Sequence, residues 1–356
     1  MSGASSPRVS VVTATYNGAR FLPAAIESIL VQSYTDFEYV IVDDASTDTS
    51  AAIAAEFAAQ DARIRHVANP VQLGPPGALN RALAASQGEY VAVLDHDDLA
   101  LPERLAQQVA FLDAQPEMGA VGAKVHFIDE AGAMSGEQAY PTHPAVARWQ
   151  LLFGASLLHS ASMVRRRLLQ QLGGYSEEHP YLCDYELLGR LAEISQIGNL
   201  PDVLACYRRS STQVSALHHT PQFGQMLLLQ YAIQQRWLGL RPDLVTFAAL
   251  RRWLHGAPPS DAAQAAAAMA QFEALYDRYC VVVPMKEESH TAVAQAGARQ
   301  WLALAHHAYT TQRAASRICW RNACQLDPNL LRRPEVLTWL RRHPLRRQKT
   351  PQPSIS

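Results

Sequence analysis

Two aspartates separated by one residue, Asp95 and Asp97, follow an apolar segment of this 356-residue chain. Two carboxylates this close repel each other unless a cation or hydrogen-bond donors neutralise them. Hard divalent cations take oxygen ligands and often hold the phosphates of a substrate as well. The pair therefore indicates a site for a divalent cation that can also hold substrate phosphates, and the alternative is an acidic turn exposed to water.

Asp44 and Asp184 are two further carboxylates in positions suited to chemistry. Asp44 follows a second apolar segment, where an ionised carboxylate can accept a hydrogen bond from the N–H of a nucleotide base. Asp184 stands where a helical pattern begins, so it is either a general base or the cap of that helix. For Asp44, the alternative is a structural cluster of turn and cap residues.

The elements that must position these aspartates alternate between strand and helix along the first 130 residues. Apolar segments predict strands at 9–14, 37–42, 64–67 and 90–94, and helical spacing predicts helices at 21–32, 49–60, 77–86 and 102–115. Such alternation predicts a parallel sheet covered by helices on both faces, with ligands at the carboxyl ends of the strands. We expect Ser46 or Thr47 to cap the second helix.

The later part of the chain changes character. Segment 156–164 predicts a strand, in which we expect His159 to be a structural residue rather than a catalytic one. After residue 215 nearly the whole pattern is helical. We therefore predict two domains, an α/β domain at 1–215 and a mostly helical region at 216–356.

The formal net charge of -1 conceals an uneven distribution. Residues 1–215 contain 14 Lys and Arg against 24 Asp and Glu, a net of -10, and residues 216–356 contain 17 against 8, a net of +9. The last basic residues are Arg332, Arg333, Arg341, Arg342, Arg346, Arg347 and Lys349. They form either a solvated tail or a surface for anionic lipid headgroups. No motif supports nucleic-acid binding.

The five cysteines form no C-x-x-C pair, which disfavours a zinc site and a disulfide framework. The first residues lack the apolar core of a signal peptide, and no segment approaches the roughly 20 apolar residues of a membrane helix. The sequence therefore predicts a cytoplasmic protein, with peripheral contact to the inner face of the membrane as an open alternative.

The ordered motifs resemble those of the family 2 glycosyltransferases over about residues 8–215. The segments that carry the resemblance are 9–18, 42–48, Asn80, 88–98, 173–175 and 184–186. The resemblance implies a GT-A fold, which is a Rossmann-like, mixed and mainly parallel sheet flanked by helices. It also implies a nucleotide-sugar donor, with UDP as the family default, a divalent metal (Mn²⁺ or Mg²⁺) and inverting transfer of one sugar.

The same resemblance implies roles for residues on the donor side. Asp44 is similar to the uracil-binding carboxylate of the family, and Ala14 and Tyr16 would line the nucleotide pocket. Asn80 lies in a helix on the donor side. Asp95 is similar to the first acid of the family's DxD motif, near the ribose and the metal.

Asp97 and Asp184 resemble the residues that carry the reaction in this family. Asp97 is similar to the metal ligand of the DxD motif, together with Asp95. Asp184 is similar to the general base, which would remove a proton from the acceptor hydroxyl. The acceptor would be a glycan or a lipid-linked glycan, as in polysaccharide biosynthesis.

Three departures from the family pattern stand out. The Tyr-Arg near the end of the domain is not followed by the usual His, and Arg208, Arg209 or His218 are the candidates to replace it. Cys183 stands where the family often has Glu before the base. The Q-x-x-R-W motif of processive synthases fails because position 233 is Ile, so we expect single-sugar transfer.

Two rival functions stay open on the sequence. A sugar-phosphate nucleotidyltransferase has a related layout, but the first loop lacks the glycines and the lysine that such enzymes carry. A catalytically silent sugar-binding or scaffold protein would not require Asp95, Asp97 and Asp184 together.

Overall fold

A computed structural model describes residues 6–210, 219–309, 311–334 and 336–337. The chain divides into two compact units, residues 1–237 and 238–356. The boundary expected at residue 215 falls within 211–218, outside the described residues, so its position stays a prediction.

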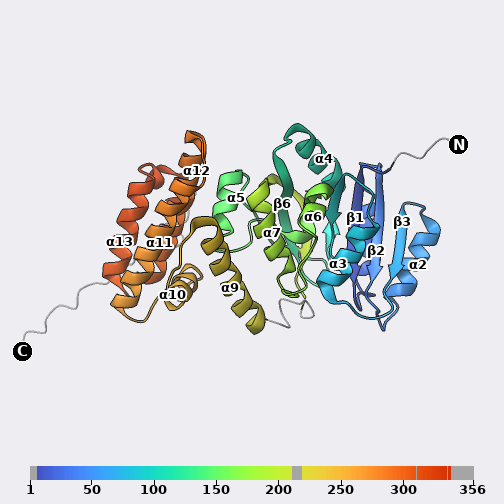
Figure 1. Cartoon of the computed structure of the whole chain (residues 1–356), viewed down its shortest axis with the longest axis horizontal. Coiled ribbons are helices and arrows are strands. Elements are labelled where there is room, and N and C mark those ends of the chain that lie inside the picture. The colour runs from blue at the N-terminus through green and yellow to red at the C-terminus, as the bar shows by residue number, and fades with distance from the viewer. Residues whose placement is uncertain (1–5, 211–218, 310, 335, 338–356) are drawn as a thin grey trace, which may run out of the picture. The chain divides into compact units, whose positions relative to one another are not determined.

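The first unit is built on one nine-stranded sheet, visible in Figure 1. Its strands are β1 (Val9–Thr15), β2 (Phe37–Asp43), β3 (Ile64–Ala68), β4 (Tyr90–Val93), β5 (Leu99–Ala100), β6 (Met118–Ile128), β7 (Met134–Gln138), β8 (Met163–Arg165) and β9 (Gln196–Arg208). They lie in the order β3-β2-β1-β4-β8-β6-β9-β5, and β7 pairs with β6. Strands β3, β2, β1 and β4 are parallel, and β8 runs antiparallel to both β4 and β6. The predicted mixed sheet is confirmed.

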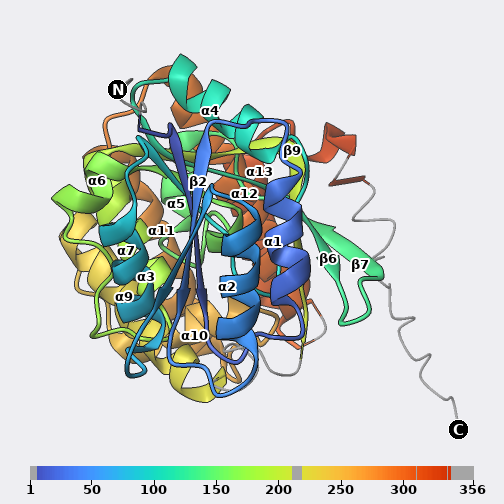
Figure 2. The ribbon, with the colours of Figure 1, turned by 90° about the vertical axis from the view of Figure 1, so that its right-hand side faces the viewer.

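Helices cover both faces of this sheet. They are α1 (Leu22–Leu30), α2 (Ser50–Gln60), α3 (Gly74–Ala85), α4 (Arg104–Ala114), α5 (Pro144–Gln150), α6 (Arg166–Gln171), α7 (Cys183–Ile194) and α9 (His219–Leu238), with a 3₁₀ turn, η1 (His159–Ala161). Figure 2 shows α3, α6 and α7 on one side and α1 and α2 on the other. Alternate residues of β1 face opposite sides, so Val9 and Val11 pack in one core with Leu22 and Ile26 of α1.

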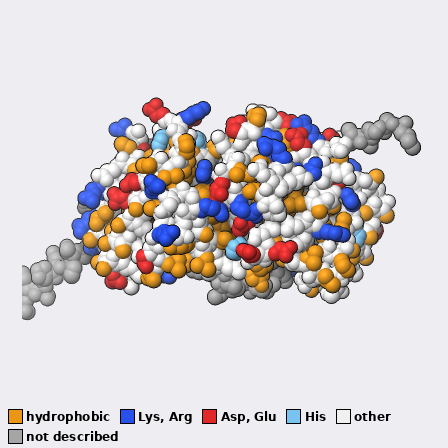
Figure 3. All heavy atoms as spheres, viewed as in Figure 1, with side chains coloured by type: hydrophobic (Ala, Val, Ile, Leu, Met, Phe, Trp, Pro, Cys, Tyr) orange, Lys and Arg blue, Asp and Glu red, His pale blue; other side chains and the backbone are white. Residues whose placement is uncertain are grey.

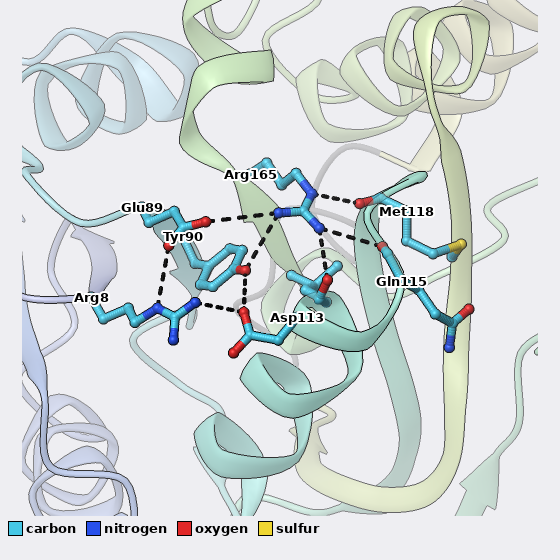
Figure 4. Close-up of polar contacts among 8 residues, drawn as sticks. Arg8, Glu89, Tyr90, Asp113, Gln115, Met118 and Arg165 are labelled. Carbon is cyan, nitrogen blue, oxygen red and sulfur yellow. Dashed lines mark hydrogen bonds and ion pairs between the residues drawn. The ribbon is translucent and has the colours of Figure 1, made fainter.

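The amino ends of the central strands are held by a dense polar network, shown in Figure 4. Arg8 forms ion pairs with Glu89 (3.2 Å) and Asp113 (2.6 Å), and the Tyr90 hydroxyl donates to the same Asp113 oxygen (2.6 Å). Arg165 is buried and donates to the carbonyls of Met118 (2.8 Å), Leu112 (2.7 Å) and Gln115 (3.3 Å). Each charged group in the network has a partner of opposite charge or a carbonyl.

The second unit is helical. It contains α10 (Leu244–Leu254), α11 (Ala262–Val282), α12 (Glu287–Ala308), α13 (Arg313–Leu326) and a 3₁₀ turn, η2 (Leu330–Arg332). Asp243 and Asp261 cap the first two helices, each accepting from a backbone N–H three residues on. Phe272 and Trp301 meet edge to face at 4.8 Å in its core. The predicted helical C-terminal region is therefore confirmed.

Two local predictions are wrong. His159 lies in the 3₁₀ turn η1 rather than in a strand, and the strand β8 begins only at Met163. Neither Ser46 nor Thr47 caps α2, because Asp48 accepts from the Ser50 N–H (2.9 Å). Among the described residues, no helix is long and apolar enough to span a membrane.

Candidate functional site

The carboxyl ends of β2, β1 and β4 bring several of the predicted residues to one edge of the sheet. Ala14 pairs with Val42 in register, and the Asp44 N–H donates to the Thr15 carbonyl (2.8 Å). Asp95 follows β4 by one residue. Adjacent parallel strands end together, so residues far apart in sequence meet here.

Polar contacts fix the loops after β1 and β2 to each other. The Asn17 side-chain oxygen accepts from the Thr47 N–H (2.8 Å), and the Gly18 N–H donates to the Ser50 hydroxyl (2.9 Å). Asn17 (φ 51°) and Ala45 (φ 60°) both adopt the left-handed conformation, which is uncommon for residues other than glycine. Tyr16, in the same loop, is 41% exposed and thus available to a ligand.

Asp44 is buried and caps α3. One of its carboxylate oxygens accepts from the Asn69 amide (2.8 Å) and the Leu73 N–H (2.9 Å), and the other from the Gly74 N–H (2.8 Å). A carboxylate offers about four acceptor positions. Three of these acceptor positions are therefore used within the protein. A base N–H has to bind the fourth position, on the oxygen that accepts from Gly74, or displace one of the three donors.

The acidic turn after β4 is anchored at its backbone. The Asp95 N–H donates to the Ser160 hydroxyl oxygen (2.9 Å), and Arg208 donates through Nε to the Asp97 carbonyl (2.8 Å). The Arg208 N–H also donates to one Asp98 carboxylate oxygen (2.7 Å), and the other Asp98 oxygen is buried without a hydrogen bond. These contacts hold the backbone of the turn, and one of them engages the Asp98 carboxylate.

The turn carries an excess of negative charge. Burial, reinforced by the charges of Asp97 and Asp184, raises the pKa of Asp95 to about 7. Burial and the other two aspartates of the turn also raise the pKa of Asp98 well above its usual range. Arg104, fully buried below the turn, has its pKa lowered to about 10 by burial despite the opposing effect of Asp98 and Asp95. The buried Arg104 guanidinium thus faces several carboxylates.

Asp184 reaches this site from a separate element, α7. The helix begins at Cys183, its N-cap is Leu182, and no side chain caps it. Asp184 therefore lies in the first turn of α7 and is not the cap that the alternative interpretation required. Its charge acts on Asp95 and on His159, which shows that α7 brings it near the acidic turn.

Asn80 is engaged elsewhere. Its side-chain nitrogen donates to the Tyr175 carbonyl and its oxygen accepts from the Tyr175 N–H, both at 2.8 Å. The Tyr175 hydroxyl in turn lies 2.7 Å from Nε2 of His159. His159 is therefore hydrogen-bonded within the protein, which agrees with the structural role expected for it.

The donor set suits a hard divalent cation held partly by substrate. Within the described parts of the chain, no three His, Cys, Asp or Glu side chains are grouped closely enough to hold a metal ion. Mg²⁺ is commonly bound by one or two carboxylates together with substrate phosphates, and Mn²⁺ accepts the same oxygen ligands. Asp95 and Asp97, two carboxylates in one turn, fit that mode of binding.

The candidates for the missing family His differ in what they contact. Arg208 is buried, with its guanidinium over the Phe21 ring (4.5 Å), and holds the acidic turn as described above. Arg209 lies over the Phe127 ring (3.6 Å), and His218 lies outside the described residues. Arg236 and Trp237, from the incomplete Q-x-x-R-W motif, both contact Glu193 of α7.

Sequence reasoning missed Arg104, Arg190 and Tyr175 as residues that build the site. Arg104 and Gln108 fall on the same helical face as Leu105, Val109 and Leu112, and a charged residue within an apolar stripe is the signal that could have identified Arg104. Tyr175 belongs to the 173–175 motif but had no assigned role, and Arg190 gave no signal because its partners on the turn are backbone carbonyls.

Comparison with known sequences identifies related proteins. The model of the family described as Glycosyl transferase family 2 matches residues 10–173. EpsE of Bacillus subtilis, named as a candidate glycosyltransferase, is 37% identical over 172 residues, covering 48% of this chain and 61% of EpsE. The glycosyltransferase MJ1057 of Methanocaldococcus jannaschii, named as uncharacterized, is 33% identical over 183 residues, covering 51% of this chain and 63% of that protein. The chain thus spans about 60% of the length of both relatives.

Solved structures of similar fold cover nearly the whole chain. S. aureus TarS 1–349 in complex with UDP-GlcNAc has a TM-score of 0.56 at 17% identity, over 91% of this chain and 92% of that one. The mannosyltransferase PcManGT from Pyrobaculum calidifontis, in complex with GDP-Man and Mn²⁺, has a TM-score of 0.52 at 20% identity, over 92% and 88%. At these identities the likeness establishes the fold, and the predicted GT-A class is confirmed.

Proposed function

The chain belongs to glycosyl transferase family 2, and from this premise we propose that it transfers one sugar from a nucleotide-sugar donor to an acceptor hydroxyl, with inversion. The observation that carries the proposal is the gathering of carboxylates at the carboxyl ends of the strands. Asp95 and Asp97 lie in one turn there, and the charge of Asp184 acts on Asp95 from α7.

The donor would bind along the loops after β1, β2 and β4. Ala14 and the exposed Tyr16 border the nucleotide, and the remaining acceptor position on Asp44 meets the N–H of a uracil base. We propose UDP as the nucleotide because a base N–H facing a carboxylate is favourable. PcManGT, whose structure contains GDP-Man, makes GDP the principal rival.

Asp184 is the proposed general base. It takes the proton from the acceptor hydroxyl as that oxygen forms a bond to the anomeric carbon. The bond from the anomeric carbon to the donor phosphate oxygen breaks at the same time, and its electron pair leaves with the nucleoside diphosphate. One displacement inverts the anomeric centre, and no second carboxylate is needed as a nucleophile.

Asp97 and Asp95 are the proposed holders of a divalent cation, Mn²⁺ or Mg²⁺, which when bound supplies positive charge to the departing diphosphate. Arg208 supports this role by fixing the Asp97 carbonyl and one Asp98 oxygen, so the turn keeps its shape. The buried Arg104 lowers the cost of gathering these carboxylates from the core side.

The proposed acceptor is a glycan or a lipid-linked glycan. We propose that the enzyme is cytoplasmic and that its basic C-terminus contacts the anionic inner face of the membrane. Figure 3 shows Lys and Arg side chains interspersed with apolar and acidic ones on the face in view. Arg333 is paired with Asp327 (2.6 Å), so the proposal depends on Arg332 and on the five basic residues from 341 to 349. Deleting residues 338–356 should abolish binding to phosphatidylserine vesicles and leave transfer to a soluble acceptor unchanged. Unchanged vesicle binding would refute this contact.

The proposed activity is tested by a screen of UDP-, GDP- and dTDP-sugars with and without Mn²⁺, first by thermal shift and then by release of nucleoside diphosphate. Ligand binding raises the melting temperature in proportion to the logarithm of its concentration over Kd. We expect a metal-dependent shift and slow hydrolysis with one nucleotide class. Pyrophosphate release from a nucleoside triphosphate and a sugar phosphate would instead indicate nucleotidyl transfer, and binding without turnover would indicate a scaffold.

A further inference from the structure

The turn formed by Gly173, Gly174 and Tyr175 lies between α6 and the segment that leads to Asp184. Both glycines have positive φ, 75° and 77°, which side-chain-bearing residues rarely adopt. Gly174 also has no room for a side chain, because a Cβ there would lie 2.4 Å from the Asn80 side-chain oxygen. The backbone of the turn is therefore shaped to receive Asn80.

Asn80 holds this turn from α3. Its amide nitrogen donates to the Tyr175 carbonyl and its amide oxygen accepts from the Tyr175 N–H, both at 2.8 Å. This is the pattern of hydrogen bonds that two paired strands exchange. The same helix has its first N–H groups bound by Asp44. Helix α3 thus connects the predicted base-binding carboxylate to the turn.

Arg190 holds the turn from α7. It donates to the carbonyls of Leu172 (2.6 Å) and Gly174 (2.8 Å), and Glu186 fixes it through two hydrogen bonds of 2.7 Å. Glu186 and Arg190 are one turn apart on the helix whose first turn carries Asp184. The placement of α7 is therefore tied to the turn.

Tyr175 makes the third connection. Its hydroxyl bonds to His159 of η1, and the next residue, Ser160, accepts from the Asp95 N–H. The two rings of His159 and Tyr175 meet edge to face at 5.5 Å, so the contact is packed as well as hydrogen-bonded. One turn therefore contacts α3, α7 and η1, the elements that lead to Asp44, Asp184 and Asp95.

We propose that Asn80 is a positioning residue, which fixes the Gly173–Tyr175 turn and thereby the location of Asp184 relative to Asp95, rather than a ligand of the donor. The inference rests on the proposed glycosyl transfer. Its basis is that the Asn80 amide pairs with the N–H and the carbonyl of Tyr175 together, and that Tyr175 is in turn bonded to His159 beside the acidic turn. A base displaced by about 1 Å can lower the rate on the order of 100-fold while the donor still binds.

The test compares Asn80→Ala and Asn80→Asp with Gln170→Ala, a matched control. Gln170 is exposed on α6 and lines the same surface cavity of about 370 Å³ as Asn80, outside the contacts described above. We expect Asn80→Ala to lower kcat about 10- to 100-fold with the donor Kd within about twofold of the wild type. Asn80→Asp keeps the acceptor for the Tyr175 N–H, so it should lose less. A donor Kd that weakens in step with kcat, or an unchanged kcat, would overturn the proposal.

Two further measurements keep the proposal testable. Because Asn80 acts through Tyr175, the loss in kcat for Asn80→Ala combined with Tyr175→Phe should be smaller than the product of the single losses. Backbone amide exchange over residues 174–184 should rise in Asn80→Ala and stay unchanged in Gln170→Ala. Exchange does not depend on turnover. Wild-type protein inactive with every donor would therefore refute the proposed function alone, and unchanged exchange in Asn80→Ala would refute the positioning role alone.

Discussion

The two ends of the central strands carry similar numbers of charged groups and treat them in opposite ways. At the amino ends, Arg8 and Arg165 form ion pairs with Glu89 and Asp113. Arg165 also donates hydrogen bonds to three backbone carbonyls. At the carboxyl ends, the buried Arg104 and Arg208 lie beside three aspartates of a single turn, and the charge of a fourth aspartate, on α7, adds to theirs.

The difference separates charge that stabilises the fold from charge that serves a ligand. A satisfied ion network needs nothing from solution, and breaking it leaves unpaired groups that destabilise the protein. Carboxylates gathered in one turn repel one another in the free protein, and a bound divalent metal would supply positive charge to them. Substitutions at the carboxyl end should therefore change activity, and those at the amino end should change stability.

The largest expected effect is that of Asp184→Asn. Loss of a general base costs typically about 10²–10⁴-fold in rate, and the carboxamide has nearly the same shape as the carboxylate. We expect kcat to fall by that amount with the donor Kd and melting temperature near those of the wild type, as measured by steady-state transfer and calorimetry. Retained turnover would remove Asp184 from the role of base.

Arg165→Met should have the largest effect on stability. The substitution keeps the apolar stem, and it removes the guanidinium that donates to the carbonyls of Met118 and Leu112 and pairs with Glu89, at a cost of about 3–5 kcal/mol. Arg167→Met, at an exposed position two residues on, is the matched control and should stay within about 0.5 kcal/mol. Urea unfolding checks both, and a lower rate per folded Arg165→Met molecule would contradict the separation of the two ends.

The aspartates at the carboxyl ends of the strands should make the stability of the protein depend on pH. A carboxyl whose folded pKa is raised stabilises the protein while it is protonated, and the folded state loses that contribution as pH rises through the folded pKa. Since the pKa of Asp95 is raised to about 7, metal-free protein should lose melting temperature between about pH 5 and 7.5 relative to Asp95→Asn. If the melting temperatures of the two proteins change equally with pH in EDTA, the pKa of Asp95 is not raised in the folded state.

Tyr90→Phe should have the smallest effect. Burial raises the pKa of Tyr90 to about 12, so its hydroxyl stays a donor to Asp113 throughout the working pH range. Because Asp113 keeps its ion pair with Arg8, we expect a loss of about 1 kcal/mol and unchanged kcat. A change in transfer rate would show that the amino-end network reaches the site.

The sequence identified the aspartates and the sheet that gathers them, because strand and helix patterns are local and parallel strands end together. It could not show that Asp44 already binds the first N–H groups of α3, or that Asn80 binds Tyr175, because those partners lie 25 to 95 residues away. His159 was misplaced in a strand since an apolar run of that length does not distinguish a strand from a 3₁₀ turn. Long-range hydrogen bonds, rather than composition, separate the ligand-facing residues from those that hold the site in shape.

The central claim is that the carboxyl-end aspartates bind a metal and a nucleotide sugar together. Calorimetric titration of the best donor into wild type, Asp97→Ala and Tyr90→Phe, with and without Mn²⁺, tests it most directly. The account predicts Mn²⁺-dependent binding in wild type and Tyr90→Phe, and a loss of at least about tenfold, or 1.4 kcal/mol, in Asp97→Ala. Donor binding that is equally tight without Mn²⁺, or unchanged in Asp97→Ala, would contradict it.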